Sequence, residues 1–417
     1  MLLAVVGVSC RDGDDAAERT VVEVFGPIVG DPGQLLGDAL REVSAESPVD
    51  LRYVGVTSFN EQLEDRLASG DRPGVVLLPQ PGLLGELAAR GVLQPLPDDV
   101  VDASGVQYPS QLVDLATVDE QPAAVWLTTD VKGLIWYRPA ALSERGLEIP
   151  TTLDQLADLS ATIRATDDGV SPWCLTMEAG ASTGWVGTDW VEDYVIRRLG
   201  PDAYDRWTEG QLRFDSPTLT AVFEELDDLL RAPGAIAGGR RAVLNTPWED
   251  TASLLLNEPA TCLMAHQADF LRRDVPAGTQ IGLDGDIDFF VLPSVDGASA
   301  PLLLGGTLAA PLSEDESVSA AMQLIAGRAL AERLNQTHDF LSPHLGVDRA
   351  TVPDAITRQL LDLIATASDV RFDGSDLMPP AVGTGTFWTG MRAFFAGEEV
   401  GELVAEIQAG WPTTGAG

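Results

Sequence analysis

Aromatic rings and carboxylates are concentrated in one stretch of the chain, residues 172–193, which reads PWCLTMEAGASTGWVGTDWVED. Small and hydroxyl residues at 180–184 predict a loop, and the apolar spacing that follows predicts a helix capped by Thr188. Trp185 and Asp189 would then lie at a loop-to-helix junction. Free backbone N–H groups, a flat ring and acceptor oxygens meet at such a junction, and together they suit a polyhydroxylated ligand.

The tryptophans of this chain are divided between the protein core and a ligand surface. Trp190 leads the apolar face of the predicted helix, so we expect it in the core. Trp185 is flanked by Gly184 and polar residues, which favours ligand contact. Trp248, in the sequence TPWED, interrupts a helical segment and is a second candidate platform, with a core position as the alternative.

Composition excludes several classes of function. The chain has 417 residues with 64 acidic against 26 basic residues, a net charge of −38, and Lys132 is its only lysine. A phosphate backbone would be repelled by this charge, so nucleic-acid binding is disfavoured. The three histidines and three cysteines do not have the spacing of metal ligands. We therefore expect no metal and no cofactor.

Strand-like and helical segments alternate in the first part of the chain. Residues 74–78 form a short apolar run bounded by glycine and proline, which is typical of a buried parallel strand. The alternation predicts an α/β fold with a doubly wound sheet, whose ligand crevice lies at the carboxyl ends of the strands. Gln80 follows such a strand and should point at the crevice. Gly306 and Thr307 follow another apolar run, where the backbone could approach a ligand closely.

Several motifs resemble a known family in the same order along the chain. Besides the stretch at 172–193 they are VLLPQPG at 76–82, GLIWY at 133–137, IPTT at 149–152, RFDGSDLMP at 371–379, AVG at 381–383, GTFW at 385–388 and the terminal WP at 411–412. The chain is similar to the α-glucoside-type extracellular solute-binding proteins, family 1, which serve ABC sugar importers. The resemblance implies a type II periplasmic-binding-protein fold, with two α/β lobes that close by a hinge.

The resemblance also implies lobe boundaries. Residues 20–132 plus 286–338 would form lobe 1, and residues 133–285 plus 339–417 would form lobe 2. Residues 1–19 would be a signal remnant and tether.

The same resemblance implies further ligand contacts. Asp130 would lie at the first crossing between the lobes and accept hydrogen bonds from sugar hydroxyls, or it would form a simple surface bridge with Lys132. Phe387 and Trp388 follow a glycine-threonine turn and would offer a third aromatic face. Together with the residues identified above, the expected ligand-binding set is Gln80, Asp130, Lys132, Trp185, Asp189, Trp248, Gly306, Thr307, Phe387 and Trp388.

The first ten residues resemble the end of a bacterial lipoprotein signal peptide, an apolar run that ends at Cys10. Lipidation of Cys10 would hold the protein at the extracellular face of the membrane. Cys174 and Cys262 would then remain as a pair in an oxidising compartment, either joined in a disulfide or left as buried free thiols.

The favoured function is capture of a sugar, an α-glucoside or related oligosaccharide, by a monomer that delivers it to ABC permease subunits without covalent chemistry. One alternative is a glycoside hydrolase that uses two carboxylates among Glu178, Asp189, Glu192 and Asp193. The other is a sugar-sensing receptor that uses the same cleft without transport.

Overall fold

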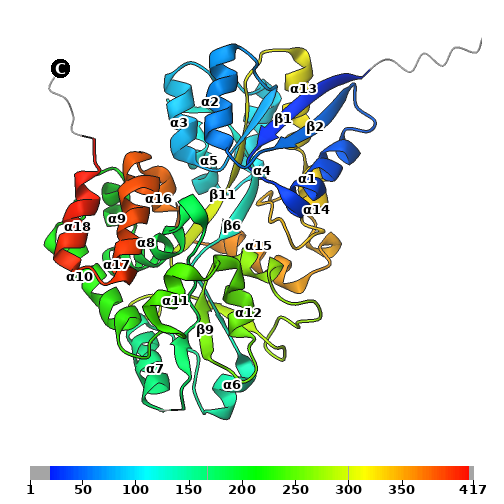
Figure 1. Cartoon of the computed structure of the whole chain (residues 1–417). Coiled ribbons are helices and arrows are strands. Elements are labelled where there is room, and N and C mark those ends of the chain that lie inside the picture. The colour runs from blue at the N-terminus through cyan, green and yellow to red at the C-terminus, as the bar shows by residue number, and fades with distance from the viewer. Residues whose placement is uncertain (1–18, 167, 299, 413–417) are drawn as a thin grey trace, which may run out of the picture.

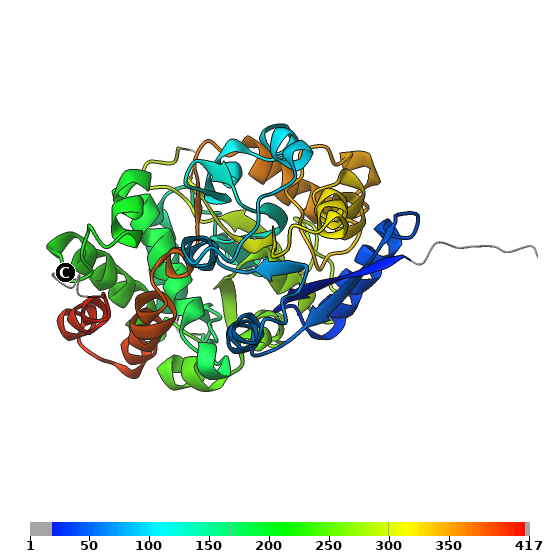
Figure 2. The same cartoon turned by 90° about the horizontal axis from the view of Figure 1, so that it is seen from above.

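The computed structural model describes residues 19–412 except 167 and 299. Cys10 and almost all of the expected tether lie outside the described residues. The chain forms two lobes, each built around its own sheet (Figure 1). The N-terminal strands and the C-terminal helices lie at opposite sides of the molecule in both views (Figures 1 and 2). Among the helices in the described ranges, none is both long enough and apolar enough to cross a bilayer.

The first lobe contains a six-stranded sheet in the order β12-β11-β3-β1-β2, with β6 also paired to β11. Its strands are β1 (Thr20–Gly26), β2 (Val49–Gly55), β3 (Val75–Leu78), β6 (Val125–Val131), β11 (Leu302–Pro311) and β12 (Val370–Phe372). Strand β1 is parallel to both β2 and β3, while β11 is antiparallel to β3 and β6. The parallel part agrees with the expected doubly wound sheet, and β3 is buried along its whole length.

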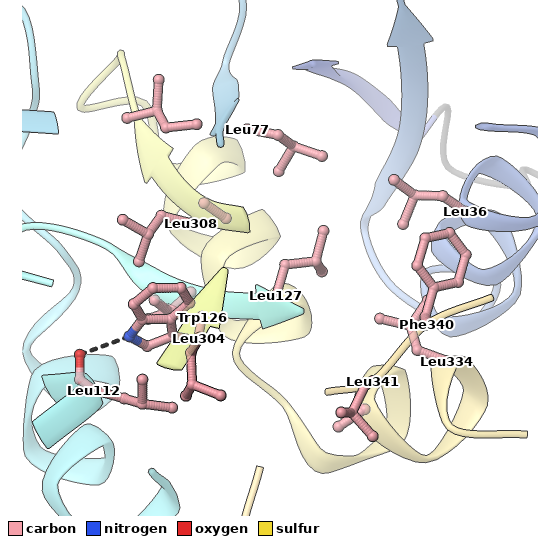
Figure 3. Packing of buried hydrophobic residues seen from close by; sticks show 14 of the residues in the cluster. Leu36, Leu77, Leu112, Trp126, Leu127, Leu304, Leu308, Leu334, Phe340 and Leu341 are labelled. Atoms are coloured by element: carbon pink, nitrogen blue, oxygen red, sulfur yellow. Dashed lines mark hydrogen bonds between the residues drawn. The ribbon is translucent and has the colours of Figure 1, made fainter. Parts of the chain in front are cut away.

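The described residues of the first lobe also form eight helices, a small hairpin and a short turn. They are α1 (Gly30–Val43), α2 (Phe59–Ser69), α3 (Pro81–Ala89), α4 (Asp98–Gln107), α5 (Ser110–Leu115), α13 (Glu316–Ile325), α14 (Arg328–Leu334) and α15 (Ala355–Thr366), with the small hairpin β4 (Thr117–Val118) and β5 (Gln121–Pro122) and the turn η5 (Arg349–Thr351). Figure 3 shows the packing inside, where Trp126 lies among leucines and its Nε1 donates to the carbonyl of Leu112 at 2.6 Å. The buried indole therefore keeps a hydrogen-bond partner.

The second lobe contains a four-stranded sheet in the order β10-β7-β9-β8. Its strands are β7 (Leu134–Tyr137), β8 (Ser171–Trp173), β9 (Cys262–His266) and β10 (Asp288–Val291). Ile135 and Tyr137 of β7 contribute to one hydrophobic cluster, and Leu134 and Trp136 contribute to the other. Both faces of β7 are thus buried, which explains why its sequence is apolar at every position.

Helices pack around the second sheet, and the last of them, α16, α17 and α18, come from the C-terminal part of the chain. They are α6 (Pro139–Glu144), α7 (Leu153–Ala165), α8 (Trp185–Leu199), α9 (Pro201–Thr208), α10 (Pro217–Leu226), α11 (Gly239–Asn245), α12 (Thr251–Leu255), α16 (Gly374–Leu377), α17 (Trp388–Ala396) and α18 (Val400–Ala409), with the short 3-10 helices η1 (Gly180–Ser182), η3 (Trp248–Asp250) and η4 (Asp269–Arg273) and the π-helical segments η2 (Asp227–Arg231) and η6 (Ala381–Phe387).

The chain passes between the two lobes three times, and two of these crossings differ from the expected boundaries. The first lies at Lys132 and Gly133, between β6 and β7. Strand β10 pairs with β7 in the second sheet, so the second crossing comes after Val291 rather than before residue 286. Strand β12 pairs with β11 in the first sheet, and the backbone of Leu341 and Leu345 bonds that of Thr129 and Gln107. The segment 339–372 therefore begins and ends in the first lobe, and the last crossing comes after Phe372. The resemblance had assigned that segment to lobe 2.

Cys174 and Cys262 are joined in a disulfide. The bond links the residue that follows β8 to the first residue of β9, two neighbouring parallel strands of the second sheet. It closes a loop with a sequence separation of 88 residues. Of the two alternatives left open by the sequence, the structure has the disulfide.

Candidate functional site

A cavity of about 680 Å³ lies at the start of helix α8. Three aromatic rings stand around it, those of Trp185, Trp248 and Phe270. The remaining lining residues are Asp130, Glu178, Ala179, Gly180, Ser182, Pro247, Glu249 and Arg273. We call this space the aromatic cavity.

The position of Trp185 follows from the glycine before it. Gly184 caps α8 with a φ of 135°, and a Cβ there would lie 2.3 Å from the carbonyl oxygen of Trp388. Only glycine fits both the conformation and the close approach. The helix therefore begins at Trp185, one turn earlier than expected, and Thr188 is not its cap. The Thr188 hydroxyl instead donates to the carbonyl of Trp185 at 2.9 Å.

The three rings come from three separate segments. Trp248 meets both other rings edge to face, and the rings of Trp185 and Phe270 are tilted to each other. Trp248 begins η3 directly after Pro247, and Phe270 lies in η4 beyond the end of β9. The ring centroids are 5.2 Å apart for Trp185 and Trp248, 5.9 Å for Trp185 and Phe270, and 5.5 Å for Trp248 and Phe270. Each ring thus supports the other two. All three are only partly buried, so ring surface remains available to a ligand.

Polar groups reach the same cavity from both lobes. Asp130 lies on β6 of the first sheet, and its Oδ1 accepts from Arg273 at 3.2 Å. The Arg273 guanidinium also lies 5.3 Å from the Phe270 ring centroid. Glu178 accepts from the backbone N–H of Gly180 at 2.8 Å through one carboxylate oxygen. Rings that cover C–H surface and carboxylates that accept from hydroxyls are therefore present together, and this combination can bind a sugar ring without covalent chemistry.

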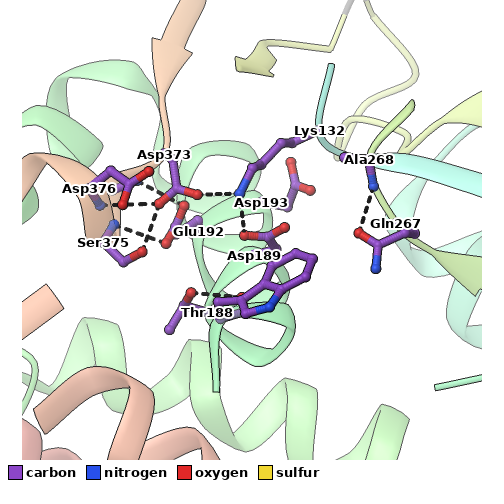
Figure 4. Close-up of polar contacts among 12 residues, drawn as sticks. Lys132, Thr188, Asp189, Glu192, Asp193, Gln267, Ala268, Asp373, Ser375 and Asp376 are labelled. Carbon is purple, nitrogen blue, oxygen red and sulfur yellow. Dashed lines mark hydrogen bonds and ion pairs between the residues drawn. The ribbon is translucent and has the colours of Figure 1, made fainter. Parts of the chain in front are cut away.

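A second polar group lies behind the aromatic cavity; four of its five residues are buried, and Asp376 is partly exposed and lines another cavity. We call it the acid cluster; it consists of Lys132, Asp189, Glu192, Asp373 and Asp376. The Lys132 ammonium donates to Asp189 at 2.9 Å and also to Asp373. Figure 4 shows Lys132 between these two carboxylates, with Glu192 and Asp376 beyond Asp373. The Lys132 ammonium is also 5.5 Å from the Trp185 ring, so the cluster and the cavity are adjacent.

Backbone and amide donors complete the acid cluster. Glu192 accepts from the backbone N–H groups of Gly374 at 2.8 Å and Ser375 at 3.0 Å. Asp376 accepts from the Gln80 side chain at 2.7 Å, which joins α16 to the residue that caps α3. The acid cluster thus ties together the first and third crossings, helix α8 and the first lobe.

Burial sets the protonation of the acid cluster. Desolvation, followed by the charges of neighbouring carboxylates, raises the pKa of Glu192 well above its usual range and that of Asp376 to about 8. Desolvation also raises the pKa of Asp189, against the opposing charge of Lys132. Burial alone would raise the pKa of Asp373, but Lys132 holds it below its usual value. One lysine cannot compensate four carboxylates, so part of the cluster carries protons at neutral pH.

Oxygens of Asp189, Glu192 and Asp373 lie within 4.8 Å of one another, a spacing that could hold a metal ion. The Lys132 ammonium bonds two of the three carboxylates. The charge that a metal would supply there is therefore supplied in this structure by the chain's only lysine.

The structure brings some of the predicted residues together and separates others. Asp130, Trp185 and Trp248 line the aromatic cavity. Lys132 and Asp189 belong to the acid cluster, and Lys132 does not form the alternative bridge with Asp130, which pairs with Arg273 instead. Gln80 lines a different cavity of about 560 Å³ between α2 and α3 of the first lobe and α16 and η6.

Phe387 and Gly306 are explained by packing. Phe387 is fully buried and its ring centroid lies 5.0 Å from that of Phe214, so it cannot offer a face to a ligand. A Cβ at Gly306 would lie 2.4 Å from the carbonyl oxygen of Thr128, and this contact between β11 and β6 accounts for the glycine. Thr307 is buried on the same strand, and Trp388 is partly exposed; neither is among the residues that line the aromatic cavity.

Phe270, Arg273 and Glu249 were not among the residues identified from the sequence. The first two belong to the segment DFLRR at 269–273, which begins shortly after the apolar strand β9 ends at His266. An aromatic residue beside arginines just past a buried strand was the available signal. Asp373 and Asp376 were noticed only as part of a motif, because nothing local to them reveals their distant partners.

The amino-acid sequence matches one family model and is similar to known proteins, all of which are described as binding proteins. The family model for "Bacterial extracellular solute-binding protein" matches residues 45–325. The chain is 32% identical to the "Osmoprotective compounds-binding protein GgtB" of Synechocystis sp., over 98% of this chain and 97% of that protein. It is 31% identical to the "Alpha-glucosides-binding periplasmic protein AglE" of Rhizobium meliloti, over 96% and 89%.

Solved structures share the fold at lower identity. The solute receptor AcbH superimposes with a TM-score of 0.75 at 16% identity, over 94% of this chain and 98% of that chain. RafE in complex with raffinose superimposes with a TM-score of 0.71 at 17% identity, over the same shares of the two chains.

Proposed function

Because the chain belongs to the bacterial extracellular solute-binding proteins, we propose that its aromatic cavity binds a sugar, an α-glucoside or related oligosaccharide, for delivery to an ABC importer. The observation that carries this proposal is the meeting of three partly exposed rings with Asp130 of the first lobe in one cavity. The 31% identity to a protein named for α-glucoside binding supports the choice of sugar class.

The arrangement provides a reason for the lobes to close on a ligand. Trp185 and Trp248 belong to the second lobe, whereas Asp130 lies on a strand of the first sheet. A sugar that stacks on the rings and donates hydroxyls to Asp130 contacts both lobes at once. Such a ligand favours the closed form, since it gains contacts there that the open form lacks.

The glycoside hydrolase alternative is disfavoured, because three of its four candidate carboxylates are buried and already bonded within the protein. Asp189 bonds Lys132, Glu192 accepts two backbone N–H groups, and Asp193 bonds Arg197 and lies 2.6 Å from His266. All three are enclosed, and among the four only Glu178 lines the aromatic cavity. A pair flanking a glycosidic bond therefore cannot be drawn from this set.

We further propose that the protein acts as a monomer on the extracellular face of the membrane, anchored by a lipid on Cys10 and docking on permease subunits. The apolar run before Cys10 in the sequence supports the anchor. Mass spectrometry of the native protein should show a lipidated amino terminus at this cysteine. An unmodified and uncleaved amino terminus would contradict the anchor without affecting the proposed ligand.

A thermal-shift panel of mono- and disaccharides tests the ligand class, followed by titration calorimetry of the sugars that stabilise the protein. A ligand present at 100 times its dissociation constant should stabilise by about 2.7 kcal/mol. Sorbitol at the same concentration controls for general osmolyte stabilisation. No shift with any sugar beyond that of sorbitol would overturn the proposed function.

A further inference from the structure

The charges that line the aromatic cavity are unbalanced. Three carboxylates line it, those of Asp130, Glu178 and Glu249, against the single guanidinium of Arg273. Arg273 is already paired with Asp130 and packed on Phe270. Within the described part of the chain, neither Glu178 nor Glu249 has a basic nitrogen within 4.0 Å. Two uncompensated negative charges therefore face the ligand space.

The Lys132 ammonium, which also lies near the cavity, does not restore the balance. The Lys132 ammonium is 5.5 Å from the Trp185 ring, but it is bonded to Asp189 and Asp373 and surrounded by the four carboxylates of the acid cluster. The carboxylates around it offset the positive charge of Lys132, so this charge does not compensate Glu178 and Glu249. The faces of the aromatic rings themselves are negative, and they attract cations rather than anions.

The excess of negative charge at the cavity also affects the pKa of a neighbouring carboxyl group. Asp274 follows Arg273 in the chain, and its pKa is raised to about 6, first by burial and then by the charge of Glu249, against the opposing charge of Arg273. The raised pKa is consistent with an excess of negative charge beside the cavity.

Glu178 is held in place at the cavity wall. Its backbone N–H donates to Thr246 at 3.0 Å and its carbonyl accepts from the N–H of Trp248 at 3.0 Å. Its side chain accepts from Gly180 through Oε1. Fixing both the backbone and one carboxylate oxygen prevents the charge from turning away when a ligand enters.

We propose, on the basis of the proposed function, that the aromatic cavity selects glycosides by charge. It accepts glycosides that are neutral or carry a protonated amine and rejects those that carry a carboxylate or phosphate. Glu178 and Glu249 are the residues that determine this specificity.

Three nearly isosteric probes test the proposal by competition calorimetry against a neutral sugar that binds. They are methyl α-glucoside, the same glycoside with a carboxylate at C6, and the same glycoside with an ammonium group at C6. We expect the carboxylate probe to bind at least tenfold more weakly than the neutral parent, which is about 1.4 kcal/mol. The ammonium probe should bind no more weakly than the parent. High salt should narrow the difference, because the two glutamates face solvent.

The double variant Glu178→Gln/Glu249→Gln identifies the source of the selection. The ratio of carboxylate to neutral affinity should rise about tenfold in this variant, whatever happens to neutral binding itself. A matched double variant, Glu224→Gln/Glu402→Gln, removes two exposed glutamates of α10 and α18 that do not line the cavity. It should leave the ratio unchanged.

Two results would overturn the charge selection while leaving the proposed function intact. The first is equal weakening of both charged probes, which would assign the loss to the missing C6 hydroxyl. The second is an unchanged affinity ratio in Glu178→Gln/Glu249→Gln. Failure of every neutral sugar to bind would instead overturn both the selection and the proposed function.

Discussion

The first turn of helix α8 differs sharply from the turns that follow it. Trp185 opens the helix, is partly exposed, and lines the aromatic cavity. Asp189, one turn later on the same side, is 2% exposed and bonded to Lys132. A sequence of alternating rings and carboxylates suggests that both kinds of residue contact the ligand. In the structure the ring of Trp185 remains accessible, whereas the carboxylates of the helix are enclosed.

The reason for this difference lies in what surrounds each side chain. A partly exposed ring needs no specific partner and gains from packing on other rings. A buried carboxylate requires a cation, hydrogen-bond donors or a proton. The crossings bring Lys132 and the backbone N–H groups of Gly374 and Ser375 to α8. The same segments that join the lobes therefore enclose the acids. The predictions below test whether the acid cluster serves folding and the aromatic cavity serves binding.

The largest expected effect comes from Lys132→Met, which removes the only lysine from the acid cluster. Leaving buried carboxylates without their cation should cost on the order of 3–5 kcal/mol of unfolding free energy at neutral pH. Urea denaturation followed by circular dichroism measures it.

The exposed pair Arg213 and Asp215 provides the control, because Arg213→Gln should leave the urea midpoint unchanged. A Lys132→Met protein within about 1 kcal/mol of the wild type would show that protons, and not the lysine, neutralise the acid cluster.

Asp376 should give the acid cluster a distinct pH dependence. Its pKa in the folded protein is about 8 against a usual value of 3.8, so the unfolded chain releases the proton first as pH rises. The stability linked to the protonated form is complete below about pH 4 and is lost as pH rises toward about 8. Urea midpoints of the wild type should fall across this window more steeply than those of Asp376→Asn. Parallel curves would contradict the raised pKa.

Trp185→Ala should affect binding more than folding. Loss of a central ring should cost about 2 kcal/mol or more of binding free energy for the sugar found in the panel. Trp190 is fully buried, so Trp190→Ala is the matched comparison and should cost about 3–5 kcal/mol of stability. Calorimetric titration and apo-protein unfolding measure the two effects. Unchanged affinity together with a destabilised apo protein in Trp185→Ala would place this ring in the core instead.

The smallest effect is expected for Gln80→Ala. This change removes the hydrogen bond from Gln80 to Asp376 and should lower stability by about 1 kcal/mol. Sugar affinity should not change measurably, because Gln80 does not line the aromatic cavity. A tenfold loss of affinity would mean that the ligand extends to the cavity between α3 and α16.

The sequence predicts those parts of the fold that depend on residues close together in the chain. The apolar run that becomes β3 and the capping residues Thr152 and Ser216, whose side chains accept from Gln155 and Leu219, are visible in sequence. The partners of β10 and β12 are not, because strand pairing depends on contacts far apart in the chain. Both misplaced lobe boundaries arise from these two strands.

The same distinction between near and distant contacts applies to the candidate site. A ring beside a glycine, as at Trp185, indicates a surface role from neighbouring residues alone. The enclosure of Asp189 requires Lys132 and Asp373, which are 57 and 184 residues away by their numbers in the chain. The pairing of Asp130 with Arg273 spans 143 residues. No local pattern could have identified these partners, and the alternative partner that the sequence offered for Lys132 was its near neighbour Asp130.

A crystal structure of the protein with a bound sugar from the panel tests the division between the two regions most directly. Our account predicts a sugar ring stacked on Trp185, with a hydroxyl donated to Asp130, and the contacts of Lys132 to Asp189 and Asp373 unchanged. A sugar bound instead among Gln80, Asp376 and the residues between α3 and α16, or one hydrogen-bonded to Asp189 in place of Lys132, would contradict it.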